Sequence, residues 1–140
     1  TMVEIAQNCI IFNDGAWAHM TDPANRQDNV LYLEHGQPMR FGKQGEKGIR
    51  LNGLTPEVVD VDEVGVDALL VHDEKAEEPT LAYLLSRMGP PDFPIPVGVF
   101  RAIDKPVYSA RLMDQVHAAQ DKKQADLDAL YRRGECWEVS

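Results

Sequence analysis

Four short apolar runs follow one another between residues 30 and 61, and each is bounded by Gly, Pro or Asn. The runs are VLYLEHG, PMRFG, KGIRLNG and EVVDV. Boundaries of this kind are typical of hairpins and meanders, because these residues adopt turn conformations or interrupt a hydrogen-bonded ladder. Helices or strands in this part of the chain must therefore be short, and we expect three or four short antiparallel strands. The run LLVHD, at Leu69–Asp73, predicts a further strand.

Two helices are predicted in the second half of the chain. The first lies in EEPTLAYLLSRMG, with Pro79 in its first turn and Gly89 after its end. One face of it carries residues spaced i, i+3, i+4 and i+7, namely Leu81, Leu84, Leu85 and Met88. The second runs from Ser109, as N-cap, to Arg133, with Gly134 as its stop and a break in the polar sequence HAAQDKKQAD. Pro90–Pro96, between the two helices, predicts an extended edge segment.

The N-terminal segment predicts a strand at Val3–Ala6 and a second apolar stretch up to Phe12. A run that is apolar on both faces is typical of a parallel strand covered on both sides. The following stretch, Asn13–Asn29, is rich in Asp, Asn, Gly and Pro, and it predicts a loop or a broken helix.

Charge and hydropathy exclude two classes of partner. The chain has 140 residues, of which 44% are apolar, and a net charge of −9. Nucleic-acid binding depends on clustered Lys and Arg, whereas the basic residues here are scattered, so we predict no nucleic-acid partner. No apolar stretch is long enough for a membrane span, and no secretory leader is recognisable at Thr1. We therefore expect no membrane partner and a cytoplasmic location.

The sequence lacks the residue patterns that zinc and phosphate sites need. Zinc sites show paired Cys or His at close spacing, whereas the four histidines are isolated, so no self-contained zinc site is predicted. FGKQGEKGIR lacks the order of a phosphate-binding loop and predicts a hairpin. The acidic residues near Asp60 and Glu77 are interpreted as solvated faces or helix ends. The isolated histidines are His19, His35, His72 and His117.

Two cysteines lie at opposite ends of the chain. Cys136 is interpreted as a small apolar residue. Cys9, taken alone, is also best read as a buried thiol. An iron–sulfur cluster needs four thiolates, so if Cys9 is a ligand, the other ligands lie outside this chain.

The stretch VEIAQNCIIFNDGAW resembles the end of the thiamin-diphosphate domain in β subunits of 2-oxoacid:ferredoxin oxidoreductases, particularly the 2-oxoglutarate-type enzymes. In that family a Cys-x-x-Phe-Asn element follows the last strand. Further blocks are similar to the C-terminal portion of the same subunit and occur in the same order, so that the resemblance covers essentially all residues. These blocks are NVLYLEHGQPMRFG, KGIRLNGLTPEVVDV, DALLVHDEKAEEPTLAYLLSRM, PDFPIPVGVFRAIDKPVYSARL and ECWEV.

The resemblance implies oxidative decarboxylation of a 2-oxoacid to its acyl-coenzyme A, with electrons passing through a four-iron four-sulfur cluster to ferredoxin. It implies thiamin diphosphate, magnesium and the cluster as cofactors of the intact subunit, and an α subunit, or a fused α/γ subunit, as partner. Only Cys9 carries over as a site residue, as the last of the four cluster ligands. No catalytic or thiamin-binding residue carries over, because the family's GDG…N motif and paired cysteines are absent.

The resemblance predicts an α/β fold for the whole subunit and an α+β arrangement for the part of it that this chain represents. Residues 1–13 would be the truncated end of the thiamin-diphosphate-binding domain, and residues 14–140 a C-terminal domain of short strands and two helices. Alone, the chain is expected to bind no cofactor, to be inactive and to be able to self-associate through its exposed first strand. The alternative is a non-catalytic α+β module that contacts partner subunits through Pro90–Pro96 and the late helix.

Overall fold

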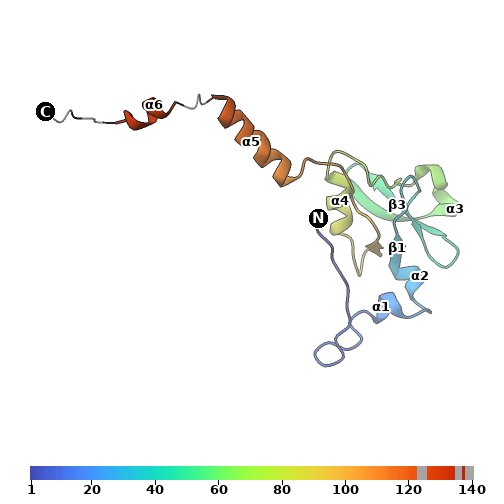
Figure 1. Cartoon of the computed structure of the whole chain (residues 1–140). Coiled ribbons are helices and arrows are strands. Elements are labelled where there is room, and N and C mark those ends of the chain that lie inside the picture. The colour runs from blue at the N-terminus through green and yellow to red at the C-terminus, as the bar shows by residue number, and fades with distance from the viewer. Residues whose placement is uncertain (123–125, 135–136, 138–140) are drawn as a thin grey trace. The chain divides into compact units, whose positions relative to one another are not determined.

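The computed structural model describes residues 1–122, 126–134 and 137. Its backbone divides into two compact units, Thr1–Ile103 and Asp104–Ser140, which we describe separately (Figure 1). Helices and strands are mixed along the chain, which confirms the predicted α+β class. The predicted domain boundary after residue 13 stays a prediction.

A three-stranded antiparallel meander forms the centre of the first unit. Its strands are β2 (Arg40–Phe41), β3 (Lys47–Asn52) and β4 (Thr55–Asp60), in the order β2-β3-β4. Gly53 has a φ of +65° in the two-residue turn between β3 and β4, a conformation that costs glycine little. These strands confirm the hairpins predicted from the second, third and fourth apolar runs.

A second, two-stranded sheet joins segments that are distant in sequence. Strand β1 (Val30–Tyr32) pairs in parallel with β5 (Ile95–Val97), so that Leu31 lies opposite Pro96. The predicted antiparallel pairing of the first apolar run is therefore wrong. Pro96 has no amide hydrogen to donate, but a short, two-stranded sheet tolerates a proline in an outer strand. The predicted extended segment Pro90–Pro96 is confirmed only at its end: residues 90–93 form a turn, in which the amide of Phe93 donates to Gly89 O at 3.1 Å, and the strand begins at Ile95.

The segment Leu69–Asp73 is extended but is not a full strand. It forms one isolated bridge, between Pro38 and Val71. Backbone hydrogen bonds hold it on both sides of the bridge, from Met39 N to Leu70 O at 2.9 Å and from His72 N to Gln37 O at 2.9 Å. The predicted strand is thus reduced to a short ladder around one bridge.

Helix α4 (Thr80–Ser86) closes one side of the core, as the apolar spacing predicted. Leu85 and Met88 are buried, and Leu81 and Leu84 pack against the same cluster. Pro79 directly precedes the helix and Arg87 caps its end, two residues before Gly89. The buried members of this cluster are Leu31, Met39, Phe41, Ile49, Leu85 and Met88.

The predicted strand at Val3–Ala6 is not formed. Residues 1–8 have no regular structure, and Met2 and Val3 are 90% and 74% exposed. A strand is completed only by ladder hydrogen bonds to a neighbour, and among the described residues none pairs with this segment. After it come two single-turn helices, α1 (Ala18–Thr21) and α2 (Arg26–Asn29), which confirm the predicted broken helix.

Asp60 ends β4 and also caps the short helix α3 (Val61–Val64), because its side chain accepts from the amide of Asp62 at 2.9 Å. A single 3₁₀ turn at Val66–Ala68 then leads to the bridge segment. The acidic residues near Asp60 were predicted to be a solvent-exposed face, but the Asp60 side chain also caps a helix.

The second unit contains α5 (Tyr108–Lys122) and α6 (Leu127–Tyr131). Ser109 lies inside α5, so its prediction as N-cap is wrong: the amide of Arg111 donates to Val107 O at 3.3 Å, so the helix begins before Ser109. Asp126 caps α6 by accepting from the amides of Asp128 and Ala129. The predicted break contains residues 123–125, which lie outside the described residues. In the described part of the chain, no helix is both long and apolar enough to cross a membrane.

Candidate functional site

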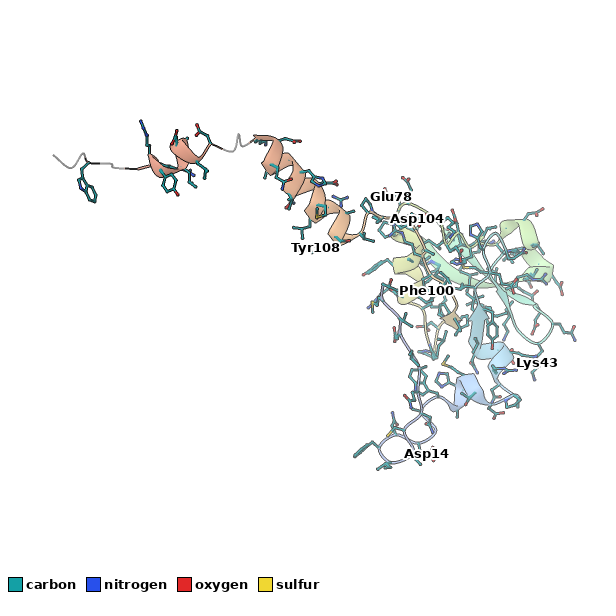
Figure 2. The ribbon with its side chains drawn as sticks, viewed as in Figure 1. Asp14, Lys43, Glu78, Phe100, Asp104 and Tyr108 are labelled. Carbon is teal, nitrogen blue, oxygen red and sulfur yellow. The ribbon has the colours of Figure 1, made fainter. Side chains whose placement is uncertain are left out.

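Cys9 lies at the start of a closed loop, Gln7–Trp17, which we call the Cys9 loop. The amide of Asn13 donates to the carbonyl oxygen of Cys9 at 2.9 Å, so the chain turns back immediately after the cysteine. A second turn follows, in which the amide of Ala18 donates to Gly15 O at 2.9 Å. Figure 2 labels Asp14 within these turns.

Three side-chain hydrogen bonds hold the two arms of the loop together. Asn8 Nδ2 donates to Asp14 Oδ1 at 3.0 Å, and Asn8 Oδ1 accepts from the amide of Gly15 at 3.1 Å. Trp17 Nε1 donates to the carbonyl oxygen of Gln7 at 3.0 Å. Gly15 has a φ of +74°, which a residue with a Cβ rarely adopts.

The thiol of Cys9 is free and exposed, so its interpretation as a buried thiol is wrong. Hydrogen bonds from the backbone amide of Phe12, and then from that of Ile11, lower the pKa of the Cys9 thiol. The smaller contribution of the Asn13 amide acts in the same direction, whereas partial desolvation opposes it. A lowered pKa favours the thiolate, which is the form that binds metals and attacks electrophiles.

Three large apolar side chains directly follow Cys9 in the sequence and are exposed. Ile10, Ile11 and Phe12 are 78%, 79% and 90% exposed. Exposed apolar residues that are contiguous in sequence mark a surface that a partner or a further part of a protein can cover. The tip therefore combines a reactive sulfur with an apolar surface.

The described residues do not complete a metal site around Cys9. No group of three or more His, Cys, Asp or Glu in that part of the chain could hold a metal ion. His72 is buried elsewhere, and His35 lies 3.6 Å from Asp73 at the end of the bridge segment. Cys136 lies outside the described residues. A metal ion or cluster bound to Cys9 would therefore need its other ligands from outside the described residues.

The glycine-rich segment after Phe41 forms a hairpin turn between β2 and β3, as predicted, and does not resemble a phosphate cradle. The amide of Gln44 donates to Glu46 Oε2 at 2.8 Å, and the Glu46 carboxylate occupies the space above Gly42. Lys47 forms an ion pair with Asp28 at 3.1 Å. The carboxylate at the centre of the turn accepts from the Gln44 amide and repels an anion, so the turn does not suit phosphate.

Sequence reasoning identified Cys9 but missed the residues that shape its loop. Asn8, Asp14 and Trp17 form its closing hydrogen bonds. The Asn-Asp-Gly sequence at residues 13–15 signals a turn, but nothing in the sequence predicts that Asn8 reaches across it.

The comparisons with known proteins give one informative match. No family model and no solved structure matches the chain. The chain is 33% identical over 142 aligned residues to 2-oxoglutarate oxidoreductase subunit KorB of Mycobacterium tuberculosis, an alignment that covers 99% of this chain. The chain spans 38% of the length of that relative. Over essentially its whole length, therefore, the chain is a homologue of a 2-oxoglutarate oxidoreductase subunit, which confirms the family resemblance of its sequence.

Proposed function

We propose that this chain is part of the β subunit of a 2-oxoglutarate oxidoreductase and that Cys9 is one thiolate ligand of the subunit's four-iron four-sulfur cluster. The proposal rests on the 33% sequence identity with KorB, in an alignment that covers 99% of this chain. The reaction is coenzyme A-dependent oxidative decarboxylation of 2-oxoglutarate, with ferredoxin as electron acceptor. We propose the α subunit as the direct partner and the cytoplasm as the location.

The Cys9 loop suits one position of such a cluster. Iron–sulfur clusters are held by thiolates, and the amides of Phe12 and Ile11 favour the thiolate of Cys9 by lowering its pKa. The exposed sulfur is accessible to an iron atom outside the loop. Because such a cluster takes four thiolates, three further cysteines from outside the described residues would complete it. When bound, the cluster carries electrons one at a time from the reaction to the acceptor.

Thiamin diphosphate and magnesium do not fit residues of this chain. The sequence contains no GDG motif, and the described residues contain no group of carboxylates that could hold a divalent ion. We therefore assign no residue here to that cofactor, and we expect these 140 residues alone to be inactive.

Replacing the sulfur in the intact subunit, produced together with its partner subunit, tests the ligand assignment. We expect Cys9→Ser to lower the iron content and the visible absorbance and to abolish 2-oxoglutarate-dependent reduction of a viologen dye. Asn52→Ser, an exposed substitution at the end of β3, is the control and should change neither. An unchanged iron content in Cys9→Ser would refute the assignment, and activity with pyruvate but not with 2-oxoglutarate would refute the substrate.

A second candidate function is contact with a partner subunit, and α5 favours it. No residue of this 15-residue helix is buried, and Leu112, Met113 and Val116 are partly exposed along it. The other predicted contact element, Pro90–Pro96, does not support this role, because Pro96 is buried and Phe93 packs against the core. Leu112→Glu with Val116→Glu should reduce copurification of the partner subunit while the iron content per subunit stays constant. Unchanged copurification would exclude α5 as the contact.

A further inference from the structure

The last strand of the meander, β4, has one free edge. The sheet order β2-β3-β4 places β4 at the end of the sheet, and in the described part of the chain no strand pairs with its other side. An unpaired edge presents backbone donors and acceptors to which a further strand can add. The register of the meander determines which groups of β4 point toward this edge.

Val58, in the middle of β4, directs its backbone groups away from β3. Hydrogen-bonded and non-hydrogen-bonded residue pairs alternate along an antiparallel ladder, and Val58 lies opposite Ile49. The Ile49 amide donates to Met39 O at 3.0 Å, and the Ile49 carbonyl oxygen accepts from Leu70 N at 2.7 Å. Ile49 thus forms its backbone bonds with other segments and not with Val58. The amide and the carbonyl group of Val58 therefore point toward the free edge.

Pro56 and Asp60 lie two residues to either side of Val58 and share its orientation. The hydrogen bond from the Val61 amide to Glu46 O, at 2.8 Å, agrees with this alternation. Pro56 offers only its carbonyl oxygen, because proline has no amide hydrogen. Asp60 offers only its amide, because it is the N-cap of α3 and its carbonyl oxygen accepts the first hydrogen bond of that helix. The edge thus presents, in order, an acceptor, a donor with an acceptor, and a donor.

This order of groups is complementary to itself when a second copy runs antiparallel about a two-fold axis at Val58. The two Val58 residues then lie opposite each other, and each donates to the carbonyl oxygen of the other. Asp60 of each copy lies opposite Pro56 of the other copy and donates to its carbonyl oxygen. The donor that Pro56 lacks would have met the Asp60 oxygen that α3 already uses, so the pairing leaves none of these groups without a partner.

The side chains of β4 also suit a second copy. Val58 is 39% exposed and lies on the same face of the meander as buried Ile49, so pairing brings two partly exposed valines together on the apolar face. The two carboxylates of β4 have partners in their own chain. Glu57 forms an ion pair with Arg50, and the Asp60 carboxylate accepts from an amide of α3. These contacts reduce the repulsion between the acidic side chains of two copies.

We propose that β4 is an interface between two copies of this chain, which join their three-stranded meanders into one continuous antiparallel sheet. The self-complementary order of backbone groups along the edge supports this proposal. The interface differs from the self-association through the first strand that the sequence predicted, because β4 is formed whereas residues 1–8 have no regular structure. The proposal is independent of the function of Cys9.

A disulfide at the two-fold axis tests the pairing in the intact subunit, produced together with its partner subunit. Val58→Cys places two thiols opposite each other, within the separation that a disulfide spans. Thr55→Cys, exposed on the same strand, is the control, because the two copies of residue 55 would lie at opposite ends of the paired strands. Under mild oxidation we expect a disulfide between two copies, identified by mass spectrometry, in Val58→Cys and not in Thr55→Cys. Equal yields in the two variants, or no link in either, would overturn the proposal.

Sedimentation of the 140-residue chain measures the contribution of the edge. Val58→Pro removes the donor of each copy at the axis, and the meander itself loses no hydrogen bond, because this amide does not bond to β3. We expect the dimer dissociation constant to rise about tenfold or more. Val58→Thr, which keeps the amide and the β-branched shape, should dimerise like the original chain. A monomeric original chain, or an unchanged dissociation constant in Val58→Pro, would refute the interface.

Two further variants separate misfolding and a different interface from the proposed pairing. If Val58→Pro loses the circular dichroism spectrum of the original chain, Val58→Lys decides, because it keeps the amide and places like charges opposite each other at the axis. Loss of the dimer in Val58→Lys supports the proposal, and its retention overturns it. Val3→Lys with Ile5→Lys should leave the dimer unchanged, and loss of the dimer there would show that the first strand is the interface instead.

Discussion

The Nε2 atom of His72 lies 2.8 Å from the carbonyl oxygen of Val99 and joins two segments that are 27 residues apart. The imidazole is 1% exposed, and a carbonyl oxygen can only accept, so Nε2 carries the proton in this contact. Nδ1 is also buried and has no hydrogen-bond partner among the described residues. One hydrogen bond thus holds the extended segment Leu69–Asp73 to the chain that follows β5.

Replacement of this imidazole should destabilise the first unit. His72→Ala leaves Val99 O without its donor and creates a cavity, which together cost about 2–4 kcal/mol of unfolding free energy. Urea denaturation of the 140-residue chain, followed by circular dichroism, measures the difference. His117→Ala, on the exposed surface of α5, is the matched control and should change the unfolding free energy by about 0.5 kcal/mol at most. Equal stabilities of the two variants would show that the buried contact contributes nothing.

A side chain at Gly48 should destabilise the first unit, because β3 passes closely over the Leu69 side chain at this position. A methyl group at Gly48 would lie 2.5 Å from Leu69 Cδ2 and 2.7 Å from Leu69 Cδ1. We expect Gly48→Ala to lower the unfolding free energy by about 1–3 kcal/mol through overpacking. Gly89→Ala, at a position where a methyl group meets nothing within 4 Å, should be nearly neutral in the same urea titration. Partial recovery in Gly48→Ala with Leu69→Ala would identify the clash as the cause, and an unaltered Gly48→Ala would disprove it.

The thiol of Cys9 should react at lower pH in the folded chain than in the unfolded chain. Amide hydrogen bonds from Phe12 and Ile11 lower its pKa, so the thiolate is favoured by folding. The rate of alkylation by iodoacetamide, measured against pH in a Cys136→Ser background, reports this pKa. The midpoint should lie below that of the same chain in concentrated urea. Coincident midpoints would mean that the amides do not face the sulfur in solution.

The Glu46 carboxylate should stabilise the hairpin only at pH values where it is ionised. Its own amide, and then that of Gln44, lower the pKa of Glu46, so its folded pKa lies below its unfolded pKa. The stabilisation is therefore present above the unfolded pKa and is lost as the pH falls through the folded pKa. We expect Glu46→Gln to have a lower urea midpoint than the original chain near neutral pH. The two midpoints should converge in acid, whereas exposed Glu78→Gln should follow the original chain at every pH.

Local patterns were sufficient for elements that depend on neighbouring residues. The i, i+3, i+4, i+7 spacing from Leu81 to Met88 predicted α4 and its buried face, because a helix is made of contacts between residues three and four apart. Gly and Asn at the ends of the short runs predicted the β2-β3-β4 meander for a similar reason, since hairpin turns are local. At the candidate site the sequence and its family resemblance supplied Cys9 alone.

Other features were decided only by tertiary structure. The parallel pairing of β1 with β5 joins residues about sixty-five apart in sequence, and neither strand carries a signal that names its partner. The strand expected at Val3–Ala6 is absent, because apolar character favours a strand only where a neighbour completes its ladder. The reach of Asn8 to Asp14 and Gly15 depends likewise on how the chain turns between them. The sequence by itself thus determined which short elements form and which sulfur is available, whereas hydrogen bonds between residues distant in sequence decided which strands pair and how the Cys9 loop closes.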